Sequence, residues 1–452
     1  MTEPHEAPVD WDRLKRPVPA WFPDAKFGIF IHWGAYSVPA WAEPVGELGA
    51  VDEQVWFRHN PYAEWYWNTV RFEDSPARQH HRETYNDAPY DDFLDAWELD
   101  EFDPADWVKL FADAGARYVV PTTKHHDGIA LWDAPGTGTR NTVRRGPHRD
   151  LVREIEIAAR NAGLRFGAYY SGGLDWSVSN FPAIDTHAAV RQNRPRDAAY
   201  AAYAYFHVKD LVDRYRPDVL WNDIEWPDAG KHGLSLGLFE LMEHYYRRVP
   251  DGVVNDRWGD THWDYKTSEY QFHLESEQSA VWENCRGIGL SFAYNREESA
   301  AHLLDGNGLI KHLVDVVSRG GNLLLNVGPT AEGLVPPGQR APLEDLGAWM
   351  KLGGEGIYGT RALSRDLAGP SEAPWSRWTQ KGGRAWAFVD ASGPTELNAR
   401  PDGFELRSAA LAEGGPVTAR SHDGKILVDL PPGPRTGLAV VSFDLLGGGD
   451  PG

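Results

Sequence analysis

Short apolar runs alternate with amphipathic helical patterns over most of the chain. The runs have the length of β-strands and lie at residues 25–32, 118–125, 165–170, 218–223, 253–257, 267–270, 289–292 and 322–328. Between them, apolar residues recur at helical spacing, as at 103–114, 151–162, 197–216 and 300–317. Strands that alternate with helices predict a parallel sheet. About eight strand candidates in roughly 300 residues favour a (β/α)8-type barrel over a doubly wound sheet.

The pattern changes after residue 360. Short β runs separated by Gly and Pro follow at 385–389, 404–406, 425–430 and 438–443, with no convincing helical pattern between them. The sequence therefore predicts two domains, a (β/α)8-like barrel over 1–360 and a small antiparallel β-sandwich over 361–452. Aromatic residues that could form a sugar platform are few in the second domain, so we expect it to buttress the barrel.

The net charge and the cysteine content exclude several classes of partner and of site. The chain has 45 Lys and Arg against 66 Asp and Glu, a formal net charge of −21. Such a chain repels phosphate backbones and anionic lipids, so we expect neither nucleic acid nor a membrane as partner. The acidic N-terminus lacks an apolar segment, which predicts a cytoplasmic protein. Cys285 is the single Cys, which excludes an intramolecular disulfide and a Cys-rich zinc site.

Tryptophan is unusually frequent, with 20 Trp against 18 Tyr and 17 Phe. Its wide flat ring with one N–H donor suits the face of a sugar, but it equally suits a large core. In the run 63–67, Glu64 lies next to Trp65, and an acidic group beside aromatic faces can hold sugar hydroxyls. A helix-face carboxylate with core Trp neighbours is the alternative interpretation.

In a barrel of this type, catalytic groups stand at the carboxyl ends of the strands. Polar or aromatic side chains end the predicted strands, namely His32, His125, His126, Tyr169, Tyr170, Asp223, Arg257, Glu269 and Phe292. Neighbouring residues of a strand point to opposite faces, so adjacent His125 and His126 are poorly spaced as metal ligands. Contact with a polar substrate is the better interpretation of this pair.

Asp223 is the strongest catalytic candidate, because it ends an apolar run where an unpaired carboxylate would be costly. Trp221 lies two residues earlier on the same face and either packs in the barrel or contacts substrate. Glu225 is a rival carboxylate if the strand continues. Glu269 ends another strand, and two carboxylates on different strands fit glycoside hydrolysis, with one as nucleophile and the other as acid/base.

Several longer motifs occur between about residues 10 and 360. They read WFPDAKFGIFIHWGAYSVPAW, TTKHHDG, FGAYYSGGLDW, RPDVLWNDIEWP, VNDRWG and GNLLLNVGPTAEG. Together and in this order they resemble the α-L-fucosidases of glycoside hydrolase family 29. The resemblance implies a retaining exo-hydrolase without metal or cofactor that releases terminal α-L-fucose from a fucosylated oligosaccharide or glycoside. Related enzymes are often oligomeric, which leaves a homo-oligomer open.

The resemblance also implies roles for individual residues. It makes Asp223 the nucleophile and Glu269, within HWDYKTSEY, the acid/base, although the acid/base position varies across the family. Residues implied to contact fucose are His32, Glu64, Trp65, His125, His126, Tyr169, Trp221, Arg257 and Phe292. The family pattern favours Tyr169 over Tyr170. Where many relatives carry Gly after the nucleophile, this chain has Ile224 and Glu225.

The mechanism implied by this resemblance sets expectations for the site. Retention requires two carboxyl groups about 5–5.5 Å apart. Arg257 or a histidine should lower the pKa of Asp223, and an apolar wall such as Trp263 should raise the pKa of Glu269. Trp65 or Phe292 should contact the C6 methyl group of fucose.

Three alternatives remain open at this point. One is a metal-dependent barrel hydrolase whose ligands are His32, His125, His126 and Asp223. A second is a non-catalytic sugar-binding protein, against which the carboxylate pair speaks. A third is a barrel glycosidase that acts on a stereochemically related sugar, such as a galactoside.

Overall fold

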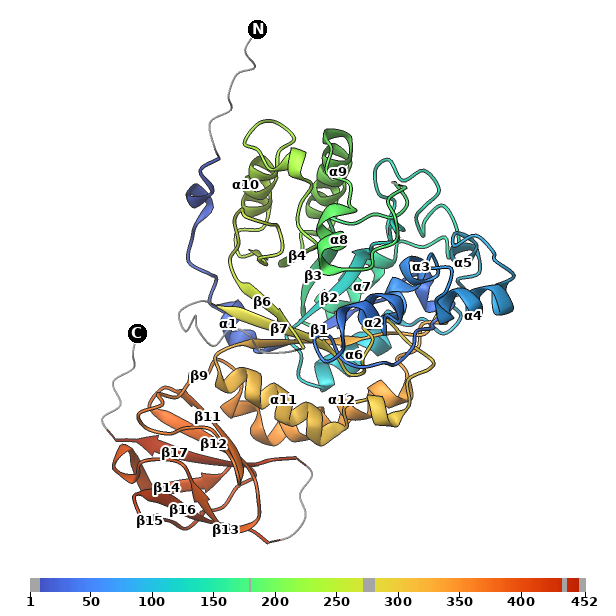
Figure 1. Ribbon diagram of the computed structural model, residues 1–452. Coiled ribbons are helices and arrows are strands. Elements are labelled where there is room, and N and C mark those ends of the chain that lie inside the picture. Colours follow the sequence, from blue (N-terminus) through green and yellow to red (C-terminus); the bar gives the residue numbers. More distant parts are fainter. Residues whose placement is uncertain (1–8, 179, 271–280, 433–436, 447–452) are drawn as a thin grey trace.

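A curled sheet of parallel strands forms the centre of the protein (Figure 1). The computed structural model describes residues 9–178, 180–270, 281–432 and 437–446. The strands of this sheet are β1 (Phe27–Ile31), β2 (Tyr118–Lys124), β3 (Arg165–Ser171), β4 (Val219–Asp223), β5 (Val253–Val254), β6 (Lys266–Glu269), β7 (Trp282–Gly287) and β8 (Asn322–Val327). Their order is β5-β4-β3-β2-β1-β8-β7-β6, so the carboxyl ends of all strands meet at one edge. The predicted barrel-type parallel sheet is confirmed in this curled form.

Amphipathic helices cover the outer face of the sheet. They are α6 (Pro104–Asp113), α7 (Leu151–Asn161), α9 (Ala198–Tyr215), α10 (Leu238–Arg248), α11 (Gly306–Ser318) and α12 (Pro337–Gly353). The short helix α1 (Trp21–Ala25) differs, because its Phe22 packs in the inner core with Tyr118 and Tyr265. Several of them begin at an aspartate whose side chain accepts backbone N–H groups of the first turn, as at Asp103, Asp150, Asp197 and Asp305. Among the described residues, no helix has the length and apolar character needed to cross a bilayer.

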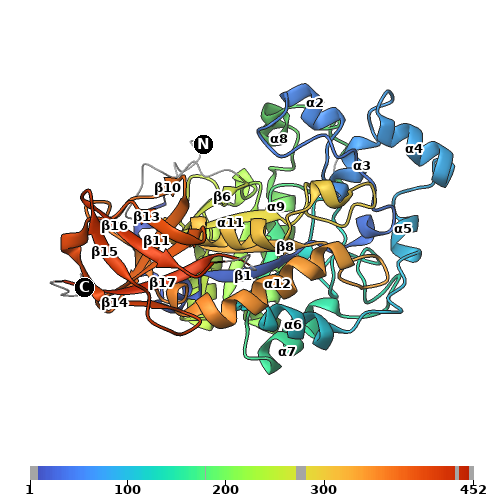
Figure 2. The ribbon, with the colours of Figure 1, turned by 90° about the horizontal axis from the view of Figure 1, so that it is seen from below.

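Shorter helices lie above the carboxyl edge of the sheet. They are α2 (Glu53–Arg58), α3 (Tyr66–Thr69), α4 (Pro76–Tyr85) and α5 (Asp92–Asp95), between β1 and β2, and α8 (His187–Gln192), between β3 and α9. Figure 2 shows α2 and α8 side by side, and the rings of Phe57 and His187 lie 5.2 Å apart across them. The segment between β1 and β2 and the segment between β3 and α9 therefore form one wall above the carboxyl ends of the strands.

The structure departs from the sequence prediction around β7. Residues 289–292 form a loop, and the strand is Trp282–Gly287 instead. This strand is polar, but its side chains are satisfied inside the protein: buried Glu283 accepts a hydrogen bond from Tyr118, and the Asn284 amide donates to Ser268. A pattern of apolar residues cannot reveal such a strand. The connection between β5 and β6, residues 255–265, also contains no helix, unlike the repeat of an ideal (β/α)8 barrel.

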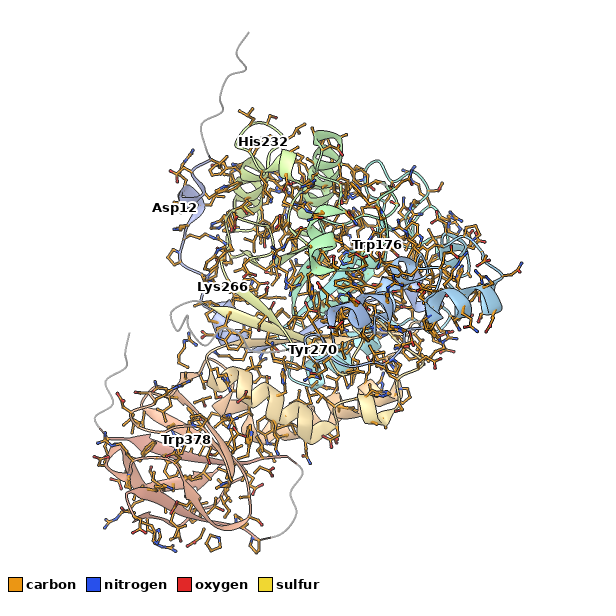
Figure 3. The ribbon with its side chains drawn as sticks, viewed as in Figure 1. Asp12, Trp176, His232, Lys266, Tyr270 and Trp378 are labelled. Atoms are coloured by element: carbon orange, nitrogen blue, oxygen red, sulfur yellow. The ribbon has the colours of Figure 1, made fainter. Side chains whose placement is uncertain are left out.

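Two antiparallel sheets follow the barrel, which confirms the predicted β-rich C-terminal part. Their strands are β9 (Arg361–Ala362), β10 (Ser371–Glu372), β11 (Trp375–Lys381), β12 (Arg384–Asp390), β13 (Gly393–Leu397), β14 (Phe404–Leu411), β15 (Ala419–His422), β16 (Lys425–Leu430) and β17 (Ala439–Leu445). One sheet has the order β10-β11-β12-β17-β14, with β9 beside β11, and the other has the order β13-β16-β15. Trp378 is buried within this part (Figure 3). The domain boundary at residue 360 stays a prediction.

The larger antiparallel sheet packs against the barrel through α12. Phe388 lies 6.0 Å from Trp349, measured between ring centroids, and the Trp349 indole N–H donates to the Leu438 carbonyl at 3.0 Å. Trp386 and Phe388 belong to the same apolar core as the barrel helices. The two parts thus share buried surface.

A tryptophan cluster ties the loop after β8 to the barrel. The indole N–H groups of Trp33, Trp97 and Trp107 donate to three carbonyls of this loop, those of Thr330, Ala331 and Gly333, at 2.8, 3.0 and 2.7 Å. The ring of Trp33 lies 4.9 Å from that of Trp97 and 4.8 Å from that of Trp107. Part of the tryptophan excess is therefore structural.

We expect Trp107→Phe to lower the free energy of unfolding by about 2–4 kcal/mol, because it leaves a cavity and a buried Gly333 carbonyl without its donor. The matched control is Trp263→Phe at a ring that is 37 % exposed, with an expected change within about 0.5 kcal/mol. Chemical denaturation of both variants measures the difference. Equal losses in the two variants would contradict a structural role for the cluster.

Candidate active site

A cavity of about 390 Å³ opens at the carboxyl ends of the parallel strands. The expected nucleophile, acid/base and fucose-contacting residues all line it, namely Asp223, Glu269, His32, Glu64, Trp65, His125, His126, Tyr169, Trp221, Arg257 and Phe292. Strands β1 to β4 and β6 supply most of them, because these strands end at the same edge. Glu64 and Trp65 come from the 3₁₀ turn η3 (Ala63–Trp65), and Phe292 comes from the loop after β7.

Asp223 is the last residue of β4, and both of its carboxylate oxygens accept hydrogen bonds. Its Oδ1 accepts from Arg257 Nη1 and from the Ile224 backbone N–H, each at 3.0 Å, and its Oδ2 accepts from the Tyr169 hydroxyl at 2.9 Å. Burial alone would raise the pKa of Asp223, but the positive charge of Arg257 and the hydrogen bonds from Tyr169 and Arg257 outweigh it and hold the pKa below its usual value. Asp223 is therefore ionised at neutral pH, as the sequence analysis predicted.

Glu269 is the last residue of β6, and Figure 3 labels Lys266, the first residue of this strand, and Tyr270, the residue that follows it. Its Oε1 accepts from the Tyr62 hydroxyl at 2.9 Å and its Oε2 from Arg257 Nη2 at 3.0 Å. One guanidinium thus holds both candidate carboxylates through its two terminal nitrogens.

The predicted apolar wall at Trp263 is wrong. Trp263 does not line the cavity; it is 37 % exposed, and Lys266 Nζ lies 5.3 Å from its ring centroid. The residues that contact Glu269 are Tyr62 and Arg257, both of which donate hydrogen bonds to it. Glu269 is therefore held by two polar donors, and Trp263 forms no wall against it.

Arg257 is held in place from two other directions. Its Nε donates to Thr267 Oγ1 at 3.1 Å, and its guanidinium carbon lies 4.7 Å from the Trp221 ring centroid. Trp221 in turn donates from Nε1 to buried Glu283 at 3.2 Å. A planar cation fixed in this way presents its donors to the carboxylates in one orientation.

Three histidines on the cavity wall are neutral. Burial lowers the pKa of His32 to about 3, and it lowers the pKa of His126 to about 4 although Asp223 opposes the shift. Burial also lowers the pKa of His125 well below its usual value. His32 Nδ1 pairs with Asn326 Oδ1 at 2.6 Å and His126 Nδ1 with Ser171 Oγ at 2.7 Å. Neutral imidazoles can donate to or accept from sugar hydroxyls.

Glu64 has the opposite protonation state from Asp223. Its Oε2 accepts from the Ala293 N–H at 2.9 Å and from Ser291 Oγ at 3.3 Å. Burial raises the pKa of Glu64 to about 8, which outweighs these hydrogen bonds. A protonated Glu64 brings a hydroxyl donor to the cavity wall.

Aromatic rings complete the walls. Trp221 stacks on Tyr169 with ring centroids 5.5 Å apart, and Phe292 packs on His32 at 4.9 Å. Tyr170 points away from the cavity, because its hydroxyl pairs with His207 Nδ1 at 3.2 Å. Tyr169 is thus the member of this pair that faces the site.

Several cavity residues were missed by sequence reasoning. They are Phe30, Leu48, Trp56, Phe57, Asn60, Tyr62, His187, Val190, Arg191, Ile224 and Cys285. Most belong to the segments between β1 and β2 and between β3 and α9. These segments lie above the sheet and contain no strand end from which a functional side chain could be predicted. The dense aromatic run from residue 56 to 67 is the one signal that could have found Tyr62, which binds Glu269.

One further candidate carboxylate lies outside the cavity. Glu225, the rival carboxylate, pairs instead with Arg194 and Lys231 at 3.0 and 2.9 Å. Among the described residues, no group of three or more His, Cys, Asp and Glu side chains has an arrangement suited to a metal ion.

Comparisons with known proteins agree on one family. The family model described as alpha-L-fucosidase matches residues 2–355. The tissue alpha-L-fucosidase of Homo sapiens is 34% identical over 393 residues, which cover 85% of this chain and 78% of that protein. The alpha-L-fucosidase of Dictyostelium discoideum is 35% identical over 363 residues, which cover 77% of this chain and 74% of that protein. A solved structure of the Thermotoga maritima alpha-fucosidase in complex with fucose has a TM-score of 0.85 and 42% identity over 96% of this chain and 99% of that one. The chain therefore belongs to the α-L-fucosidases, glycoside hydrolase family 29.

Proposed function

We propose that this protein hydrolyses terminal α-L-fucosyl linkages of oligosaccharides or glycosides with retention of configuration. Asp223 is the nucleophile and Glu269 the acid/base in this proposal. The observation that carries it is the guanidinium of Arg257, which binds both carboxylates in one cavity while Asp223 stays ionised. A Thermotoga maritima alpha-fucosidase that is 42% identical to this chain has been solved in complex with a mechanism based inhibitor, which supports a covalent step here.

In the first step, Asp223 attacks the anomeric carbon and the glycosidic bond breaks. Glu269 gives its proton to the departing oxygen, and a fucosyl ester forms on Asp223. Tyr62 and Arg257 each donate a hydrogen bond to Glu269 and position its carboxyl group for this transfer. As the ester forms, Asp223 loses its charge and Arg257 then stabilises ionised Glu269.

In the second step, Glu269 takes a proton from water, and the water oxygen attacks the anomeric carbon. The ester bond breaks and the carboxylate of Asp223 reforms beside Arg257 and Tyr169. Two displacements at one carbon restore the starting configuration.

The walls of the cavity match the chemistry of fucose. His32, His125 and His126 supply neutral ring nitrogens for hydroxyl groups, and Glu64 supplies a protonated carboxyl. Fucose is a 6-deoxy sugar, so its methyl group and apolar ring face need an aromatic surface. Trp65 and Phe292 line the same cavity and provide that surface.

We expect Asp223→Ala to lower kcat on an aryl α-L-fucoside by about 10³-fold or more, because no other group is placed to form the ester. Added azide should enter the vacated space, restore part of the turnover and yield β-L-fucosyl azide. Asp228→Asn, at a half-exposed aspartate on the same loop, is the control and should keep its activity. Turnover of Asp223→Ala near the wild-type rate without azide would remove Asp223 from this role.

Glu269→Ala should affect substrates according to their leaving group. Hydrolysis of a fucosyl oligosaccharide should fall by about 10²–10⁴-fold, because its leaving oxygen needs a proton. An aryl fucoside with a good leaving group should still form the ester, and azide should accelerate turnover and give α-L-fucosyl azide. Equal losses on both substrates, with no effect of azide, would contradict an acid/base role for Glu269.

A third test uses the protonated state of Glu64. The value of kcat/KM should decline as the pH rises through about 8, because Glu64 then loses its proton and a buried charge replaces a hydroxyl donor. Glu64→Gln resembles the protonated form, so it should remain active and lose this alkaline decline. If Glu64→Gln instead abolishes hydrolysis of fucosyl oligosaccharides and azide restores turnover of aryl fucosides, Glu64 is the acid/base in place of Glu269.

A further inference from the structure

The turn that follows Asp223 has an unusual backbone. Ile224 and Glu225 both have positive φ, at +56° and +67°. Left-handed backbone crowds the Cβ atom of any residue except glycine, and a β-branched residue such as isoleucine is a true outlier there. Two such residues in succession require support from the surrounding structure.

This turn contributes directly to the site. The Ile224 N–H donates to Oδ1 of Asp223 at 3.0 Å, and the Ile224 side chain lines the cavity. The left-handed conformation therefore supplies one of the hydrogen bonds to the proposed nucleophile and one apolar part of the wall.

Glu225 connects the turn to two cations. Its Oε2 accepts from Arg194 Nη2 at 3.0 Å and from Lys231 Nζ at 2.9 Å. The Arg194 side chain is only 4% exposed and also donates to the Trp226 carbonyl, so it is a fixed anchor. The Glu225 carbonyl accepts from Asn222 Nδ2 at 2.8 Å, which ties the turn back to β4.

The loop after β3 closes the other side of the turn. A Cβ atom on Gly173 would lie 1.5 Å from the Ile224 carbonyl oxygen, so only glycine allows this approach. The Gly173 N–H also donates to the Asp223 carbonyl at 3.1 Å. The turn is thus confined between Gly173 on one side and the ion pairs of Glu225 on the other.

We propose that Glu225 is a positioning residue for the reaction: its ion pairs with Arg194 and Lys231 hold the left-handed turn that keeps the Ile224 N–H on the carboxylate of Asp223. This inference rests on the proposed role of Asp223 as nucleophile. Glycine at position 225 would adopt the turn without strain. Glutamate at this position needs the tether that its side chain supplies.

Asp228 offers a matched comparison within the same cluster. It binds the same two cations, Arg194 at 2.8 Å and Lys231 at 3.2 Å, but its backbone is not among the positive-φ residues. A general contribution of the cluster to stability would appear equally in variants of Asp228 and Glu225. A contribution through the turn would appear only at Glu225.

The experiment compares Glu225→Gln, Glu225→Gly and Asp228→Asn on an aryl α-L-fucoside, with thermal unfolding of each variant. We expect Glu225→Gln to lower kcat/KM by roughly 10-fold, because the donor to Asp223 is displaced. Glu225→Gly should regain much of this loss, since its backbone needs no tether. Asp228→Asn should stay within about twofold of the wild type.

The acid limb of the pH profile of kcat/KM distinguishes two effects of these substitutions on Asp223, the loss of a positioned N–H donor and the loss of a nearby negative charge. The groups that face Asp223 are Arg257, His126, Tyr169 and the Ile224 N–H, with Glu269 on the far side of Arg257. Loss of the N–H donor raises the pKa of Asp223, so the acid limb of Glu225→Gln should move to higher pH. Loss of a nearby negative charge alone would move it to lower pH, in Glu225→Gln and Asp228→Asn alike.

Several results would overturn the inference. They are wild-type kinetics of Glu225→Gln, equal losses in Glu225→Gln and Asp228→Asn, or an acid limb that moves to lower pH. A Glu225→Gln protein that fails to fold while Glu225→Gly and Asp228→Asn fold would support the tether. If Asp223→Ala keeps its activity, the proposed function itself fails; if only Glu225→Gln behaves like the wild type, the inference about Glu225 fails alone.

Discussion

The bridge from Arg257 to Asp223 and Glu269 is the interaction on which the site depends. Two carboxylates in one buried cavity would repel each other, and one would take up a proton unless a cation lay between them. The guanidinium supplies that cation, with one terminal nitrogen for each carboxylate at 3.0 Å. A buried cation is itself costly, and its two ion pairs offset that cost. The strands that deliver these groups therefore have to end at the same edge of the sheet.

Tryptophan has two roles in this molecule. Trp33, Trp97 and Trp107 hold the loop after β8 through their indole N–H groups, and they serve the fold. Trp221 and Trp65 line the cavity. Trp221 has both roles. The Arg257 guanidinium packs on its ring, and its indole N–H donates a hydrogen bond to Glu283 inside the barrel. The excess of this residue thus reflects both a large core and an aromatic cavity.

The elements that could be predicted from the sequence are those determined by a local pattern of apolar and polar residues. Strands β1 to β4 and β8 are apolar runs, and the polar side chains at their ends follow from the topology of a parallel sheet. Strand β7 was not predicted, because a polar strand inside a barrel is stabilised by partners that are remote in sequence, as Glu283 is by Tyr118. Trp263 could not be placed correctly for a related reason: its neighbours in sequence do not determine whether its ring faces Glu269 or solvent. The same limit hid Tyr62.

In the proposed mechanism, Asp223 carries the fucosyl group during turnover. The most direct measurement inactivates the enzyme with a fluorinated fucosyl fluoride that forms the ester but hydrolyses slowly, and then locates the added mass by peptide mass spectrometry. We expect one label per chain, on the peptide that contains Asp223. A label on Glu269 or Glu64 instead, or inactivation without a covalent label, would contradict it.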